Sequence, residues 1–284
     1  TWTAPSVQAV FDRHLPRWRQ DNVTLRYAID IPENEIVEAH AAAKQAMLDA
    51  VRERTGVELR PDIFTIGFAR RAATYKRADF LFTDPERLQR MAEQQGGMQI
   101  LYAGKAHPAD EPGKAKIRRV IELAHELRES ALRIVYIENY AWKLGALLTG
   151  GVDLWLNTPR RPYEASGTSG MKAALNGVPS LSVLDGWWIE GWIEGVTGWA
   201  IDDHDEEAGE VESLYDHLEK VILPMFYKDQ GQWRRVMRST IALNGSFFNT
   251  QRMLEQYVIN AYFPERPGEK KAESREGVLE KSLV

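Results

Sequence analysis

The sequence predicts an α/β protein built on a doubly wound, Rossmann-like parallel sheet, with added helices at both ends. Six short apolar segments have the length and composition of buried strands. They are residues 63–69, 98–103, 132–137, 151–156, 178–184 and 198–201. Helical patterns alternate with several of these segments, and this alternation favours a parallel sheet whose ligands bind at the carboxyl ends of the strands.

Helical patterns account for most of the remaining chain. Residues 1–60 form a helical lead-in, in which a long helix begins near Pro32, with acids in its first turn, and stops at Gly56. Further helices are expected over residues 84–96, 114–127, 171–175, 205–223, 230–243 and 247–263. We therefore divide the chain into the lead-in, a Rossmann-like domain with C-terminal helices over residues 61–263, and a polar tail over 264–284.

Composition excludes several functional classes. The chain has 284 residues, 44% of them hydrophobic and 27% charged, which is typical of a soluble globular protein. A net charge of −5 gives no reason to expect nucleic acid or an acidic membrane as a partner. The absence of cysteine excludes disulfides and thiolate metal sites and suits a cytoplasmic protein. The opening T-W-T-A-P-S-V has no methionine, and we interpret the chain as the inner part of a longer sequence.

Residues 164–177, E-A-S-G-T-S-G-M-K-A-A-L-N-G, form the most distinctive segment. A loop of Gly, Ser and Thr that runs into a helix presents unpaired backbone N–H groups, and these make an anion site together with the helix dipole. We place Lys172 in the first helical turn, where the dipole and burial would lower its pKa and leave a nucleophilic free amine. The alternative is a glycine-rich turn before an ordinary helix with a solvated lysine. Local chemistry leaves both open.

A second group of polar segments follows the expected strands. Residues 70–77, R-R-A-A-T-Y-K-R, bring four cations directly after the first strand, and such groups suit phosphate. The alternative is a solvated basic loop. Residues 104–113, 138–142 and 158–172 follow other strands. Because parallel strands end at one edge of a sheet, we expect these segments to share a single site.

The 164–177 segment closely resembles the cofactor segment of the α-glucan (glycogen, starch and maltodextrin) phosphorylases. In that family the matching lysine carries pyridoxal phosphate, so the resemblance implies that Lys172 is the cofactor lysine. It also implies that Gly167, Thr168 and Ser169 bind the cofactor. Glu164, Ser166 and the Gly167 amide would hold the hydroxyl groups of the transferred glucosyl residue.

Two other segments resemble the same family. Residues 70–77 resemble its K-R-x-x-x-Y-K-R signature, which implies that Arg71 and Lys76 bind substrate phosphate and that Arg70 contacts the cofactor phosphate. Glu138-Asn139-Tyr140 resembles its E-N-Y motif, whose tyrosine lies beside the cofactor ring. Ala141 stands where many members carry arginine. His107, in a turn that resembles the family's G-K-A-x-P, is interpreted as a turn residue rather than a general base.

The resemblance implies the C-terminal, cofactor-bearing lobe of a two-lobe glycosyltransferase architecture. The implied reaction is retaining phosphorolysis of α-1,4-glucan by inorganic phosphate to glucose 1-phosphate, with Arg71, Lys76 and Lys172 as catalytic residues. An N-terminal lobe would complete the cleft, so the chain is expected to be inactive alone. Membrane and nucleic acid are not expected as partners, no metal is expected, and a homo-oligomer is left open.

Two alternative functions remain. A nucleotide-sugar glycosyltransferase of the same architecture tends to carry a second glutamate eight residues after the first, where this chain has Lys172. A non-catalytic glucan- or cofactor-binding module is the other alternative, and the intact Arg71, Lys76 and Glu164 argue against it.

Two residue clusters are interpreted conservatively. We interpret the four tryptophans at positions 187, 188, 192 and 199 as residues that pack in the core or between domains, rather than as rings that stack on a sugar. The acidic run at 202–207 is read as a loop and helix start rather than a metal site.

Overall fold

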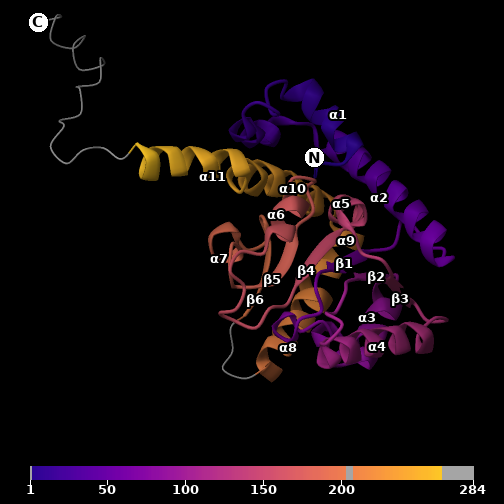
Figure 1. Ribbon diagram of the computed structural model, residues 1–284. Helices are drawn as coiled ribbons and strands as arrows, with labels where there is room; N and C mark the ends of the chain where they lie inside the picture. Colours follow the sequence, from indigo (N-terminus) through magenta and orange to yellow (C-terminus); the bar gives the residue numbers. More distant parts are fainter. Residues whose placement is uncertain (1, 203–206, 264–284) are drawn as a thin grey trace, which may run out of the picture. The chain divides into compact units, whose positions relative to one another are not determined.

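The computed structural model describes residues 2–202 and 207–263 and contains a six-stranded, all-parallel sheet (Figure 1). The strands are β1 (Thr65–Ala69), β2 (Met98–Ala103), β3 (Leu132–Ile137), β4 (Leu154–Asn157), β5 (Ser180–Val183) and β6 (Gly198–Ile201). Their spatial order is β3-β2-β1-β4-β5-β6. This order confirms the predicted doubly wound α/β fold, and it places the topological switch point between β1 and β4.

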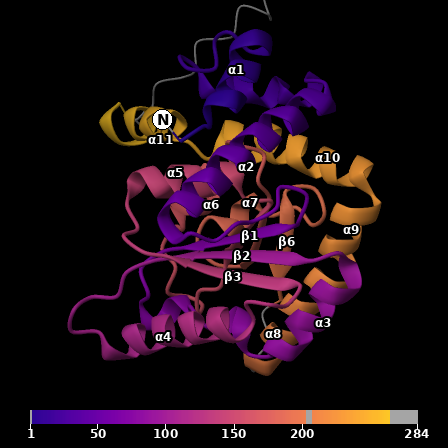
Figure 2. The ribbon, with the colours of Figure 1, turned by 90° about the vertical axis from the view of Figure 1, so that its right-hand side faces the viewer.

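Both faces of the sheet are covered by helices, because successive strand residues point to opposite sides. In β2, Ile100 packs with α3 (Pro85–Gln95) and α4 (Glu111–Glu126) on one face. Its neighbour Leu101 packs with α2 (Glu33–Thr55) and α5 (Trp142–Gly151) on the other. Figure 2 shows the sheet between these two layers.

Helix α5 was not expected from the sequence, and the fourth strand begins at Leu154 rather than at residue 151. The α5 sequence W-K-L-G-A-L-L-T-G-G is mostly apolar and has glycines that disfavour a helix. It lacks the polar face by which an amphipathic helix is recognised. Leu144 and Leu148, four residues apart, are both buried against the sheet, so tertiary packing outweighs the low local propensity.

The N-terminal residues belong to the same compact unit as the sheet. They form α1 (Pro5–His14), the 3-10 helix η1 (Asn22–Asp30) and α2. As predicted, α2 begins after Pro32, and Gly56 ends it in the left-handed conformation, with φ +71°.

Helices also follow β6, but they are more segmented than predicted. The order is α8 (Glu207–Asp216), the π-helical η4 (His217–Ile222), α9 (Leu223–Lys228), α10 (Gln230–Ser239) and the π-helical η5 (Thr240–Gly245). The chain divides into two compact units, residues 1–249 and 250–284. In the second, the described residues form α11 (Thr250–Tyr257) and η6 (Val258–Tyr262). The predicted tail at 264–284 lies outside the described residues. None of the helices described is both long and apolar enough to cross a membrane.

Candidate functional site at the carboxyl edge of the sheet

Two loops leave the sheet at its switch point. The basic loop (residues 70–77) follows β1, and the Glu164 loop (residues 158–167) follows β4. At such a switch point the onward connections run to opposite sides of the sheet, and ligands of α/β proteins commonly bind there. The expected convergence of polar segments at one edge is therefore confirmed for these two loops.

Three charged side chains meet between the loops. Glu164 is buried, and its carboxylate accepts hydrogen bonds from Lys76 Nζ and, at 3.3 Å, from Arg70 Nη2. Burial lowers the pKa of Arg70, and the charge of Glu164 opposes that shift. The other terminal nitrogen, Arg70 Nη1, is buried without a hydrogen-bond partner. Two cations against one carboxylate leave a net positive charge, and an added anion would satisfy the remaining donor.

The basic loop is tied to the Glu164 loop by Arg77, a residue whose role the sequence did not indicate. Its buried guanidinium donates to the carbonyl oxygens of Thr158 and Pro159, at 3.1 and 3.0 Å, and pairs with the buried carboxylate of Glu210 on α8. The Thr158 hydroxyl donates back to the Lys76 carbonyl oxygen at 3.2 Å. These bonds fix the spacing between the loops that carry Lys76 and Glu164.

Lys172 lies on α6 (Thr168–Ala174), in its last turn, so the prediction that it lies in the first turn was wrong. The helix begins three residues earlier than expected because Gly167 takes the left-handed conformation, with φ +83°, directly before Thr168. No side chain caps this helix start. Burial lowers the pKa of Lys172, as predicted. The predicted contribution of the helix dipole does not apply, because a lysine in the last turn lies near the negative end of the dipole.

Lys172 shares its surroundings with the N-terminal segment and with the loop after β3. Its ammonium lies 3.9 Å from the ring centroid of Trp2. Asn176, one turn beyond Lys172, holds this segment by donating to the Trp2 carbonyl oxygen at 3.0 Å. A Cβ on Gly145 would lie 3.0 Å from the Tyr140 hydroxyl and 3.6 Å from the Trp2 ring, so both rings border the same glycine. The sequence did not single out Trp2.

Tyr140 links this group to the charged cluster. Burial raises the pKa of its hydroxyl, and the charge of Arg70 opposes the shift, so the two side chains lie within electrostatic reach of each other. Ser169, in the first turn of α6, accepts a hydrogen bond from Trp155 Nε1 at 3.1 Å.

Some predicted site residues stand apart from these contacts. Arg71 and Thr168 are exposed at the same edge, where a ligand can reach them. His107 is exposed, and its Nδ1 accepts from the Ala109 N–H at 3.1 Å, which confirms a turn residue. Trp187, Trp188 and Trp199 are buried, as the packing interpretation predicted, whereas Trp192 is exposed. Residues 203–206 of the acidic run lie outside the described residues.

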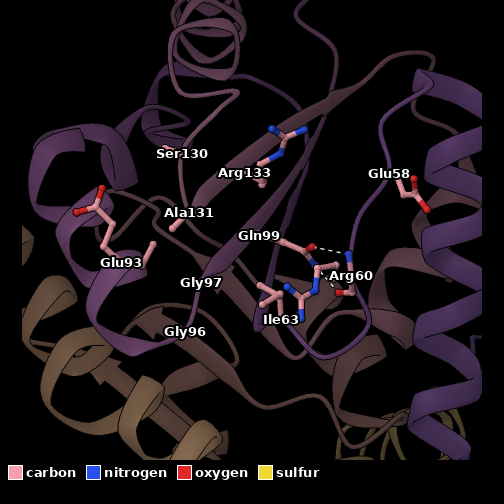
Figure 3. Close-up of a pocket in the computed structure, with 11 residues that line it drawn as sticks. Glu58, Arg60, Ile63, Glu93, Gly96, Gly97, Gln99, Ser130, Ala131 and Arg133 are labelled. Carbon is pink, nitrogen blue, oxygen red and sulfur yellow. Dashed lines mark hydrogen bonds between the residues drawn. The ribbon is translucent and has the colours of Figure 1, made fainter.

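Two cavities lie away from Lys172. One, of about 340 Å³, is at the opposite, amino-terminal edge of the sheet and contains Arg60 and Arg133 (Figure 3). Its buried amide, Gln99, is satisfied by the Arg60 backbone and the Thr65 hydroxyl, so it offers no free group to a ligand. The other, of about 620 Å³, is bordered by Tyr75 and α4. This second cavity is also lined by Arg77 of the basic loop and by Arg160 and Tyr163 of the Glu164 loop, so it lies beside the charged cluster.

The sheet order and the charged cluster at its switch point define a Rossmann-like lobe of the kind found in glycosyltransferases. Comparison with known proteins narrows this class. The family model for carbohydrate phosphorylases matches residues 27–198, and the chain belongs to that family.

Named relatives cover most of this chain. It is 39% identical to the maltodextrin phosphorylase of Thermococcus litoralis, over 92% of this chain and 34% of that protein. It is 36% identical to the glycogen phosphorylase of Aquifex aeolicus, over 92% of this chain and 42% of that protein. It is 41% identical to the glycogen phosphorylase of Mycobacterium tuberculosis, over 72% of this chain and 25% of that protein. The chain therefore spans well under half the length of these relatives.

Proposed function

We propose that this chain is the cofactor-bearing lobe of an α-glucan phosphorylase that uses pyridoxal phosphate to convert α-1,4-glucan and phosphate to glucose 1-phosphate with retention. The observation that carries the proposal is the position of Lys172. It is half-buried on α6, a helix that starts after the left-handed Gly167 without a side-chain cap, and this helix follows the loop that holds Glu164 beside Arg70 and Lys76. Membership of the carbohydrate phosphorylase family supports it.

The residues at this edge fit pyridoxal phosphate. Lys172, whose lowered pKa increases the fraction of free amine, would carry the group. The cofactor phosphate would lie at the start of α6, near Gly167, Thr168 and Ser169, and would give the unpartnered Arg70 Nη1 an acceptor. When bound, the group supplies a phosphate that exchanges a proton with substrate phosphate.

Arg71, Lys76 and Glu164 would act on the substrates. Arg71, exposed, and Lys76, paired with Glu164, would bind inorganic phosphate and offset its repulsion from the cofactor phosphate. Glu164, with Ser166 and the Gly167 amide, would hold the hydroxyl groups of the glucosyl residue. Because Lys76 and Glu164 are paired with each other, the sugar-binding carboxylate and the phosphate-binding cation are held next to each other before either substrate binds.

The nucleotide-sugar alternative is less well supported. The position eight residues after Glu164 is Lys172, whose ammonium lies over Trp2. The second glutamate typical of those glycosyltransferases is therefore absent from this position.

The proposal includes an N-terminal lobe that completes the cleft, and the chain's span of less than half the length of its named relatives supports this part of the proposal. Water at an open edge would screen the phosphate contacts and compete for the proton. The test is release of glucose 1-phosphate from maltodextrin and phosphate by residues 1–284, with and without a separately expressed N-terminal half. We expect activity only with both halves. Full activity of this chain alone would contradict the two-lobe proposal, and no activity in the reconstituted pair would contradict the proposed reaction.

A further inference from the structure

Asp185 is the second residue after β5 and is buried, with 5% of its surface exposed. One carboxylate oxygen accepts a hydrogen bond from the Glu164 N–H at 2.9 Å, and the other accepts from the Gly186 N–H at 2.9 Å. The bond to Glu164 joins residues 21 positions apart in the chain, so it connects two separate loops at the carboxyl edge. A local turn would explain only the bond to Gly186.

The two residues after Asp185 also contact the backbone of the Glu164 loop. Gly186 has φ +57°, and a Cβ at this position would lie 2.5 Å from the Ser166 carbonyl oxygen and 2.9 Å from that of Glu164. The Trp187 N–H donates to the Ser166 carbonyl oxygen at 2.8 Å. Residues 185–187 thus form a seat for the backbone of residues 164–166.

The ring of Trp187 extends this seat to the start of α6. A Cβ on Gly167 would lie 3.3 Å from the ring, and one on Gly170 would lie 2.7 Å from it. The segment that carries the sugar-binding groups and the helix that carries Lys172 therefore lie against the same short stretch of chain.

We infer that Asp185 is a positioning residue for sugar recognition, which acts through the backbone of Glu164 and does not touch the substrate. The inference rests on the proposed function, in which Glu164 and Ser166 hold the glucosyl hydroxyls. A carboxylate suits this task because it accepts at both oxygens, and two backbone N–H groups need acceptors here. Asparagine has nearly the same shape but only one acceptor, so one N–H would face an amide NH₂ group instead.

Hydrogen exchange on the 284-residue chain tests the positioning directly and needs no catalytic activity. The Asp185→Asn variant is compared with Asp153→Asn, which alters a buried carboxylate at the other end of the sheet, bonded to His40 and Lys44 on α2. We expect amides of residues 164–167 to exchange about tenfold faster in Asp185→Asn, because a buried N–H without a partner destabilises the closed state. In Asp153→Asn the faster exchange should instead lie in α2. Wild-type exchange at 164–167 in Asp185→Asn would overturn the inference.

Kinetics with both halves of the enzyme test the consequence for sugar binding. Asp185→Asn should raise the KM for glucose 1-phosphate about tenfold, while cofactor content and the KM for inorganic phosphate stay within about twofold of wild type. Equal losses of sugar, phosphate and cofactor would indicate a general structural role and overturn the inference. If the wild-type pair has no phosphorolysis activity, the proposed function fails, and the exchange experiment still decides the positioning.

A second variant covers the case in which Asp185→Asn does not fold. Gly186→Ala keeps the carboxylate but brings a methyl group against the carbonyl oxygens of Ser166 and Glu164. It should raise the KM for glucose 1-phosphate and the exchange rate of the same amides. Wild-type behaviour of this variant in both measurements would overturn the inference.

Discussion

The two ends of the β1–β4 pair carry buried charge clusters that differ in their ratio of cations to carboxylates. At the amino end, the Asp153 carboxylate accepts from Lys44 Nζ at 2.6 Å, from His40 Nε2 at 3.1 Å and from the Thr65 N–H at 2.8 Å. Lys44 also donates to the Ile63 carbonyl oxygen at 2.8 Å. The cluster attaches α2 to the sheet, and both oxygens of its carboxylate are occupied by protein donors.

At the carboxyl end, the Glu164 cluster has two cations for one carboxylate. Glu164 is surrounded by Lys76 and Arg70, but Arg70 Nη1 is buried without a partner. A buried donor without an acceptor costs stability unless a ligand supplies one. His40 Nδ1 at the amino end is also buried without a partner, so an unpartnered nitrogen alone does not distinguish the two clusters. The difference lies in charge, because the Asp153 carboxylate faces one ammonium, whereas Glu164 faces an ammonium and a guanidinium. We propose that this excess positive charge at the carboxyl end binds an anion. The predictions below test this difference.

The largest effect on stability is expected at the amino end. Asp153→Ala leaves the Lys44 ammonium buried without its counter-charge, and should cost about 3–5 kcal/mol of the free energy of unfolding. Urea denaturation of the chain measures it. A loss below about 1 kcal/mol would mean that the Asp153 cluster does not stabilise α2 against the sheet.

The largest effect on activity is expected at the carboxyl end. Arg71→Ala and Lys76→Ala should each lose about 3–4 kcal/mol of transition-state stabilisation in phosphate-dependent turnover and retain the cofactor. Steady-state kinetics in both directions, with cofactor assayed, measure this in the two-lobe enzyme. Arg118→Ala, at an exposed position on α4, is the matched control. Wild-type phosphate dependence in both variants would refute the assigned roles.

A smaller effect concerns anion binding without catalysis. In the chain without cofactor, inorganic phosphate can take the place proposed for the cofactor phosphate beside Arg70 Nη1. At about 100 times its dissociation constant it should stabilise the chain by about 2.7 kcal/mol, because it binds the folded state and not the unfolded state. Thermal melts with phosphate measure the effect, and Arg70→Ala should reduce it while Asp153→Asn should not. Equal phosphate stabilisation of wild type and Arg70→Ala would contradict anion binding at Arg70.

The smallest effect is the contribution of the Asp153 cluster to the pH dependence of stability. Burial alone would raise the pKa of Asp153, but Lys44 and His40 outweigh it and hold the pKa below its ordinary value of 3.8. A lowered folded-state pKa gives stability that is present above 3.8 and is lost as the pH falls through the lower value. Asp153→Asn should therefore flatten the acid limb of the stability curve. An unchanged acid limb would show that Asp153 does not contribute to it.

The sequence predicted the sheet better than the site. All six strands were recognisable because each is a short apolar run between turn residues, and the order of polar loops after them followed from the parallel topology. The exception was α5, in which an all-round apolar pattern hides a buried helix. Glu164, Lys76 and Arg70 were recognised by their motifs and do meet.

What the sequence missed depends on contacts between distant positions. Asp185 reads as an ordinary Asp-Gly turn, and only the fold brings its carboxylate to the Glu164 N–H. Trp2 lies 170 positions before Lys172, yet its ring is next to the lysine. The prediction of where Lys172 lies within α6 was wrong. The start of this helix depends on the backbone conformation of Gly167, which the residue pattern does not determine.

The central claim, that Lys172 carries pyridoxal phosphate, is tested most directly by reductive labelling. The cofactor-saturated two-lobe enzyme is treated with borohydride, digested, and mapped by mass spectrometry, with Lys172→Ala as the control. We predict a pyridoxyl group on Lys172, because burial lowers its pKa and it lies at the edge that holds Arg70. A label on another lysine, or no label on the saturated wild-type enzyme, would contradict the assignment.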